Sequence, residues 1–277
     1  LIENFYDATV LSAISNTDYE GEIKAYGDTV NIRTTPELTI ETYVKGQTLK
    51  VENPDKPKLQ LLIDKGEYFA AVEDDVDKVQ SDIKMMDQWS KDASERMKIK
   101  IDQRVLTDIL PGISASNKGA TAGAISGNIN LGVTGTPVAV SSTNVIEHII
   151  NMGLTLDEAN APESDRFLII PAKMAAYIKQ SDLKDASITG DGNSPLRNGR
   201  LGMIDRFTLY VSHNLKKTGS EFDVIAGHKM GMTFASQMTN LETLRSETTF
   251  GNIIRGLQVY GYKVVKPEAL SQSVITL

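Results

Sequence analysis

Apolar and polar residues alternate along residues 28–70, and Gly and Pro interrupt the alternation. A period of two bounded by such residues is typical of strands joined by turns. The apolar positions are Val30, Ile32, Leu38, Ile40, Val44, Leu49, Val51, Leu59, Leu61 and Ile63, with Tyr43 on the opposite face. A turn is expected at residues 45–47. Because a two-stranded ribbon is marginal in water, the segment is either an edge hairpin on the chain's own sheet or a long loop that lies on another chain.

A period near 3.6 residues runs through residues 72–110 and ends at Pro111 and Gly112. It predicts one amphipathic helix, long enough at ~1.5 Å per residue to be the spine of the molecule. A coiled-coil strand is the alternative, but Trp89 and Ile109 fall off the apolar seam, which favours a single packed helix. The acids of residues 73–77 fit the first turn of this helix, where the helix dipole favours negative charge. The run lacks the Gly and the terminal Glu of a calcium loop.

The rest of the chain mixes short helices and strands. Residues 1–26 predict an arm with one short helix, and residues 112–141 are rich in small residues that suit turns. Helices are expected to begin at Asn144, which forms a capping-box pattern with Glu147, and at Pro171, which suits a first helical turn. The expected strands are residues 166–170, 207–211, 222–226 and 273–275, with a hairpin from residue 241 that turns near residue 250 and ends at residues 266–267. The mixture predicts an α+β fold.

Charge and composition exclude several classes of protein. The net charge is −7, so the overall field does not favour nucleic acid. Lys98, Lys100 and Arg104 form one basic stripe, for which a solvated helix face is a commoner meaning than contact with DNA. The chain has no cysteine, which excludes disulfides, thiolate metal sites and a catalytic cysteine. Its apolar runs are far shorter than the roughly 20 residues that a membrane span needs.

The residues that could carry chemistry form no known motif. His148, His213 and His228 lie far apart and lack the spacing of metal ligands. The sequence has neither a Gly-x-Ser-x-Gly elbow nor a phosphate-binding Gly-x-x-x-x-Gly-Lys-Ser/Thr motif. A Ser-His-Asp triad needs no local motif, so spacing alone does not test for one. We therefore predict no catalytic residue, no cofactor and no metal site, and expect that the protein is not an enzyme.

Four stretches of the chain resemble the major capsid proteins of tailed bacteriophages, which share the Johnson fold of the Hong Kong 97 type. They are RFLIIPAKMAAYIKQSDL at residues 166–183, GRLGMIDRFTLYVSHNL at 199–215, FDVIAGHKMGMTFASQ at 222–237 and RSETTFGNIIRGLQVYGYKVVKPEAL at 245–270. The order of arm, extended β loop, long helix, α/β lobe and closing hairpin is similar to the family over nearly the whole chain. Each stretch alone is mostly strand and turn pattern, so it is their order that carries the resemblance.

The resemblance implies a division of the chain into named parts. These are an N-terminal arm (1–26), an extended β loop (27–71), a spine helix with a peripheral lobe (72–140 and 241–265) and an axial α/β lobe (141–240 and 266–277). The loop would contact neighbouring subunits, and the candidate contact residues are Leu38, Ile40, Tyr43, Val44, Lys45, Leu49 and Val51. Some relatives join a loop lysine to a neighbour's asparagine. Lys45 lies near the expected tip, but no partner asparagine or catalytic glutamate is identifiable, so no cross-link is expected.

The resemblance also implies a function. The chain would assemble with copies of itself, as pentamers and hexamers, into an icosahedral head that encloses double-stranded DNA. Scaffolding, portal and decoration proteins are the further partners that it implies. The protein would be made in the cytoplasm of a bacterial host and would reside in the virion, with no membrane partner. The alternatives are the shell protein of an encapsulin-like bacterial compartment and, from another class, an α/β binding or hydrolytic domain.

Overall fold

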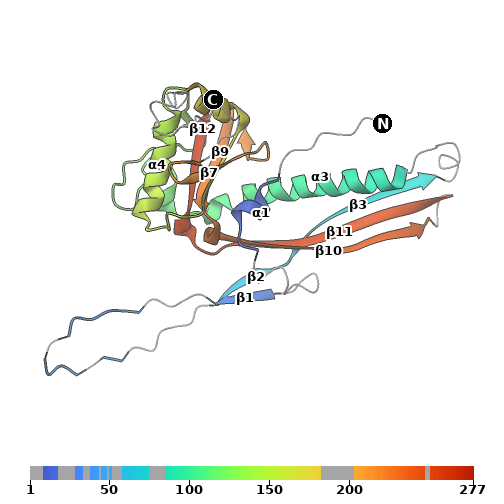
Figure 1. Cartoon of the computed structure of the whole chain (residues 1–277). Helices are drawn as coiled ribbons and strands as arrows, with labels where there is room; N and C mark the ends of the chain where they lie inside the picture. Colours follow the sequence, from blue (N-terminus) through green and yellow to red (C-terminus); the bar gives the residue numbers. More distant parts are fainter. Residues whose placement is uncertain are drawn as a thin grey trace.

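The computed structural model describes residues 9–17, 29–33, 38–43, 45–48, 50–51, 58–74, 85–181, 203–246 and 250–277. They form two main sheets that meet at one end of a long helix (Figure 1). The longer strands and the long helix make an elongated part of the molecule, while the second sheet and two shorter helices make a globular lobe. The mixed architecture confirms the predicted α+β class.

The elongated part is a three-stranded antiparallel sheet in the order β10-β11-β3, with the helix α3 (Met85–Asp108) along it. Its strands are β3 (Lys65–Asp74), β10 (Met232–Arg245) and β11 (Gly251–Val264). We call it the long sheet. The predicted closing hairpin is therefore present, although its first strand begins at Met232 and not at residue 241. The expected boundary of the axial lobe at residue 240 thus lies inside β10, and the division into lobes stays a prediction.

The start predicted for the spine helix is wrong. Residues 72–74 belong to β3, where Val72 pairs with Ile253 and Asp74 with Gly251. The alternation of Tyr68, Ala70 and Val72 continues into this strand, but a helical spacing from Val72 onward masks it in the sequence. Glu73 and Asp74 are strand residues, so the helix dipole does not explain them; residues 75–84 lie outside the described part of the chain.

A two-stranded ribbon packs on the long sheet. Its strands are β1 (Thr29–Arg33) and β2 (Lys58–Leu62), which pair in antiparallel fashion. The residues that bury the contact are Val30, Ile32, Leu61, Ile63, Ala235 and Val259. The approach is close because Gly261 has no side chain: a Cβ there would lie 2.4 Å from the carbonyl oxygen of Leu62. The ribbon is a separate two-stranded sheet that packs on a face of the long sheet, so it is not an edge hairpin of that sheet.

Between the two strands of the ribbon, the described residues form a loop that extends away from both sheets (Figure 1). Residues 38–43, 47–48 and 50–51 adopt no strand, so the strands predicted there are wrong for these residues. The predicted turn is present at Lys45 and Gly46, whose φ of +91° favours glycine. An alternating pattern forms a strand only where a partner strand is available.

The globular lobe is built on a seven-stranded sheet, ordered β4-β12-β9-β5-β7-β6 with β8 paired to β9. We call it the lobe sheet. Its strands are β4 (Val138–Ala139), β5 (Arg166–Ile170), β6 (Met203–Ile204), β7 (Phe207–Val211), β8 (Lys217–Thr218), β9 (Glu221–His228) and β12 (Leu270–Thr276). The helices α4 (Val145–Glu158) and α5 (Ala172–Gln180) pack on it through one apolar core. The strands predicted at 166–170 and 207–211 are confirmed residue for residue.

The helix starts of the lobe differ in detail from the predicted ones. Asn144 is the N-cap of α4, but its side chain makes no cap hydrogen bond, because its Oδ1 accepts from the backbone N–H of Ser141 at 2.7 Å. Pro171 is the N-cap of α5 and not its first residue. The short helices are α1 (Leu11–Ile14), η2 (Leu110–Gly112), η3 (Ala115–Asn117), η5 (Lys229–Gly231) and η6 (Pro267–Ala269).

A second apolar core joins the two sheets. It contains Ile101, Val105 and Leu106 of α3 together with residues of both sheets, such as Phe167 of β5 and Tyr260 of β11. The same cluster takes in Val10, Leu11 and Ile14 of the N-terminal segment. Because its side chains come from every major part of the fold, this cluster fixes how the lobe sits on the elongated part.

Candidate assembly surfaces

The loop predicted to make inter-subunit contacts is uncovered in the single chain. Ile40 is 95% exposed and Val51 91%, while Leu38 and Tyr43 are about two-thirds exposed, at 66% and 68%. Lys45 at the turn is exposed too, and the remaining two candidates, Val44 and Leu49, lie outside the described residues. Scattered apolar side chains are common on surfaces, but four on one projecting loop make an apolar surface that is exposed among the described residues.

An ion pair lies across the tip of the loop. Lys50 forms an ion pair with Glu41 across the turn, with 3.1 Å between Nζ and Oε1. An exposed pair of this kind contributes about 1 kcal/mol at most. The pair connects the two sides of the loop on either side of the turn.

The long sheet presents a second exposed apolar surface on the face opposite α3, beyond the part of that face where the ribbon packs on Ala235 and Val259. Strand alternation turns Glu67 toward the helix and Tyr68 away from it, and Tyr68 is 78% exposed. The other exposed apolar residues of this face are Val72, Leu244 and Leu257. A shallow hollow of about 460 Å³ lies beside Tyr68 and Leu257, with the ion pair Glu242–Arg255 (2.7 Å) at its rim. We call this surface the open sheet face.

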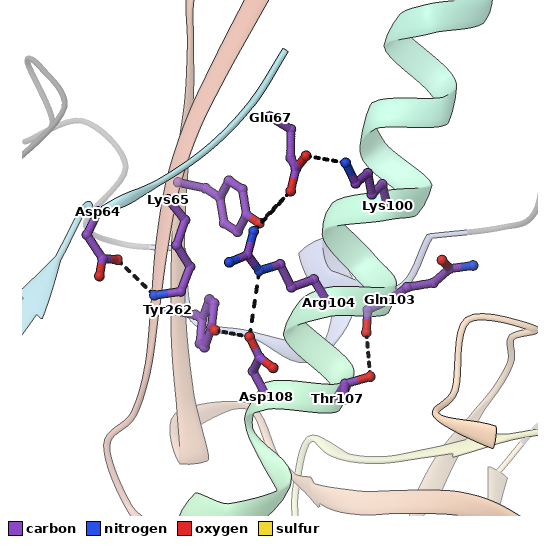
Figure 2. A network of polar contacts seen from close by, with 10 residues as sticks. Asp64, Lys65, Glu67, Lys100, Gln103, Arg104, Thr107, Asp108 and Tyr262 are labelled. Carbon is purple, nitrogen blue, oxygen red and sulfur yellow. Dashed lines mark hydrogen bonds and ion pairs between the residues drawn. The ribbon is translucent and has the colours of Figure 1, made fainter. Parts of the chain in front are cut away.

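The opposite face of the long sheet is fastened to α3 by a polar network (Figure 2). The carboxylate of Glu67, only 7% exposed, contacts Nζ of Lys100 at 2.6 Å and Nη1 of Arg104 at 3.1 Å. Burial alone would raise the pKa of Glu67, but the hydrogen bonds and charges of the two cations outweigh it and hold the pKa below its usual value. Lys100 and Arg104 keep 68% and 45% of their side-chain surface exposed while they pair with Glu67, and Lys98 pairs with Glu95, so the interpretation as a solvated helix face fits all three residues.

The network continues to the end of the helix. The Tyr262 hydroxyl donates to Asp108 at 2.5 Å, and Nζ of Lys65 lies 4.6 Å from the centre of the Tyr262 ring. Burial, followed by the hydrogen bond and charge of Asp108, raises the pKa of Tyr262, so the ring stays a neutral donor. Sheet and helix are thus joined by polar contacts on one side, which leaves the open sheet face as the side available for a partner.

The histidines do not form a catalytic arrangement within the described residues. His148 is buried in the lobe, and its Nε2 lies 2.9 Å from the Ser273 hydroxyl. That hydroxyl donates to the carbonyl oxygen of Leu131, and no carboxylate contact to His148 is present among the described residues. Burial lowers the pKa of His148 to about 4, so the ring is neutral at pH 7. The pair is a buried polar contact between α4 and β12, which sequence reasoning missed because β12 resembles a half-exposed strand.

The described ranges contain neither a metal-binding cluster nor a membrane-spanning helix. These residues contain no group of three or more histidine, aspartate or glutamate side chains placed to hold a metal ion. None of their helices is long and apolar enough to cross a membrane. The surfaces that stand out in this part of the chain are therefore the loop and the open sheet face.

A family model described as phage capsid protein matches residues 56–272, well over half of the chain. The chain belongs to the phage capsid protein family. As a member it is a major capsid protein, whose role is to build the shell of a virion. The family match favours this reading over an encapsulin-like compartment. No curated protein matches.

Solved structures agree with the fold of this capsid protein along its full length. The structure named Mycobacterium phage Che8 is 25% identical, with a TM-score of 0.77, and the match covers 99% of this chain and 93% of that one. The capsid of Cyanophage P-SCSP1u is 14% identical, with a TM-score of 0.74 over 100% of this chain and 90% of that one. The capsid of Myoviridae phage XM1 is 13% identical, with a TM-score of 0.62 over 99% and 94%. The expected Johnson-type fold is confirmed.

Proposed function

We propose that this capsid protein assembles, as pentamers and hexamers, into an icosahedral head in which the loop of each subunit lies on the open sheet face of a neighbour. The observation that supports this contact is that both surfaces carry exposed apolar side chains, which the described part of one chain does not cover. Burying apolar area gives about 25 cal/mol per Å². A loop that projects from its own subunit reaches only a surface outside it.

The free energy of the proposed contact is modest for one subunit, but the sum over all subunits of a shell is large. A loop of this size covers less area than a stable two-protein interface needs. In a closed shell each subunit gives one loop and receives another, so many weak contacts act together. The charged groups beside each surface, Lys50 and Glu41 on the loop and the pair Glu242–Arg255 on the sheet, would set the register of the contact more than its strength.

We further propose that the head encloses double-stranded DNA passively and that the protein is not an enzyme. The support is the net charge of −7 and the pairing of Lys100 and Arg104 with Glu67, which offsets part of the positive charge of this stripe. Scaffolding, portal and decoration proteins stay proposed partners, and synthesis in the cytoplasm of a bacterial host stays a proposal. Nucleic acid inside purified shells would separate this function from that of an encapsulin-like compartment.

Two charge substitutions on the loop test the contact. Ile40→Asp combined with Tyr43→Asp should leave a folded subunit, since both side chains are exposed, and should abolish shells because the buried interface would then contain unpaired carboxylates. Tyr68→Asp on the open sheet face should have the same effect from the receiving side. Shell yield is measured by sedimentation and electron microscopy, with circular dichroism as the check on folding.

The matched control is Ile125→Asp, because Ile125 is 82% exposed but lies on the globular lobe away from both surfaces. It should assemble as the unmodified protein does. Normal shells from both the loop variant and the Tyr68 variant would refute the proposed contact.

A further inference from the structure

Residues 9–17 lie where the long sheet and the lobe sheet meet (Figure 1). Three apolar side chains of this segment are buried in the core that joins the sheets: Val10 is 3% exposed, Leu11 6% and Ile14 0%. The segment reaches both sheets at once, since the core contains strands of each. It is thus placed to influence how one sheet sits relative to the other.

A buried carboxylate holds the first part of this segment. Asp102 of α3 is fully buried, and its Oδ1 accepts the backbone N–H groups of Val10 at 3.1 Å and Leu11 at 3.2 Å. Its Oδ2 accepts from Nδ2 of Asn214, at 2.8 Å, in the segment that follows β7 of the lobe sheet. One side chain therefore joins the N-terminal segment, the spine helix and the lobe. A buried carboxylate loses its hydration, so these N–H donors are what make its position tolerable.

The second part of the segment is attached to the long sheet. Asn16 forms a parallel bridge beside Thr233 at the start of β10. The backbone N–H of Asn16 donates to Met232 at 3.0 Å, and its carbonyl oxygen accepts from the N–H of Phe234 at 3.1 Å. Within seven residues the chain thus passes from a contact with the helix and the lobe to a contact with the long sheet.

The chain connects the two sheets through α3 between β3 and β4, and also by two short connections. The helix η5 (Lys229–Gly231) joins β9 of the lobe sheet to β10, and η6 (Pro267–Ala269) lies between β11 and β12. Short connections of this kind are where domains bend when packing allows it. The N-terminal segment adds a further contact between the sheets. If the segment detached, the two backbone hydrogen bonds between Asn16 and β10 would break, but the hydrogen bonds that pair the strands within each sheet would stay.

We propose that residues 9–17 are a latch that fixes the lobe sheet relative to the long sheet, and that Asp102 is the residue that holds the latch closed. With the latch docked, the subunit is one rigid body. When the latch leaves, the shared core loses three of its apolar side chains and Asp102 loses two of its donors, so the two sheets can move about η5 and η6. The proposal concerns one subunit, so its failure would leave the shell-building function intact.

The test measures the separation of the two parts in the full chain with spin labels. The chain has no cysteine, so Lys91→Cys on α3 and Glu147→Cys on α4, both exposed positions, take the labels alone. Asp102→Ala should broaden or shift the distribution of label distances. Hydrogen exchange of the amides of Val10 and Leu11, followed in parallel, should become about tenfold faster or more, as expected for local opening.

A reciprocal exchange separates the latch from a general loss of stability. In the double variant Asp102→Asn with Asn214→Asp, the amide oxygen at position 102 can accept from Val10 and Leu11 while its NH₂ group donates to the new carboxylate. This variant should restore the narrow distance distribution and the slow exchange, whereas Asp102→Asn alone, which opposes two NH₂ groups, should not. Should Asp102→Ala fail to fold, the contrast between these two variants still decides the question.

Two results would overturn the proposal. If Asp102→Ala accelerates exchange at Val10 and Leu11 but leaves the label distances unchanged, the segment is bound without fixing the sheets. If exchange at these amides does not change, Asp102 does not hold the segment. Asp92→Ala on the same helix serves as the control, since Asp92 pairs with Arg96 within that helix at 2.8 Å, and it should alter neither readout.

Discussion

The carboxylate of Glu67 has almost no access to water, whereas the side chain of Glu242 on the same sheet is 39% exposed. Its two cationic partners lie on the neighbouring helix and keep part of their own surface exposed, so the pair avoids the full cost of burying both charges. His148 shows the opposite solution, since it is buried without a charged partner in the described structure and stays neutral. For each of these two residues, a single substitution should change the stability of the fold.

Glu67→Gln should lower the free energy of unfolding by about 1–3 kcal/mol, because the charge-assisted hydrogen bonds from Lys100 and Arg104 are weakened at a buried site. The measurement is urea unfolding of the unassembled full chain. Glu95→Gln is the matched control: Glu95 pairs with Lys98 at 2.7 Å, but both side chains are about half exposed, so a change below about 0.5 kcal/mol is expected. Equal effects of the two substitutions would contradict the role given to Glu67.

His148 predicts a loss of stability in mild acid. Its pKa falls from 6.5 in the unfolded chain to about 4 in the fold, so folding disfavours the protonated ring. The contribution of neutral His148 to the free energy of unfolding is complete above pH 6.5 and is lost as the pH falls toward 4. The loss amounts to about 3 kcal/mol, since each pKa unit corresponds to about 1.4 kcal/mol.

His148→Gln should remove that part of the pH dependence, since its amide can contact Ser273 without titrating. The comparison is the difference in unfolding free energy between pH 7 and pH 4.5. His213→Gln, at an exposed position, should keep the dependence of the unmodified chain. An unchanged pH dependence in His148→Gln would show that other groups are responsible.

At the scale of elements, local pattern predicted most of the lobe. The strand Arg166–Ile170 and the helix that follows Pro171 have their apolar positions close together in sequence, so their period is visible without a partner. The spine helix was predicted by the same signal, but its start was wrong because Val72 belongs to a strand whose partner, Ile253, is far away in the chain. No local pattern reports such a partner.

The strands predicted in the loop are absent from its described residues, and the polar contacts were not predicted at all. Both outcomes have a related cause. Leu38 and Ile40 alternate with polar residues as strands do, yet a single chain offers them no strand to pair with. The contacts of Glu67 with α3 and of His148 with Ser273 join residues that are distant in sequence. The candidate loop residues were named because the resemblance implied an extended loop, whereas the open sheet face depends on the register of three strands that are distant in sequence.

Met97 tests the spine helix as an element. It is 4% exposed, so Met97→Glu would bury a carboxylate without a partner and should cost about 3–5 kcal/mol, a large share of the stability of a domain. Yield of soluble full chain and its unfolding midpoint are the measurements. Lys91→Glu, on an exposed position of the same helix, should change the midpoint little, and a similar loss in both variants would argue against a buried face at Met97.

At the scale of the whole molecule, the chain combines a stable lobe with parts that a single copy leaves uncovered. These parts are the loop, which extends away from both sheets, and the open sheet face of the elongated part, whose other face is covered by α3. A protein that worked alone would gain nothing from this shape, while a shell subunit needs surfaces that its neighbours complete. The family match and the solved capsid structures agree with that conclusion.

Electron microscopy of particles formed by the purified full chain tests this account most directly. The account predicts closed icosahedral shells, with density for each loop lying on the long sheet of a neighbouring subunit. If both the unmodified chain and the control Ile125→Asp stay folded monomers and form no particles, the result would contradict the account.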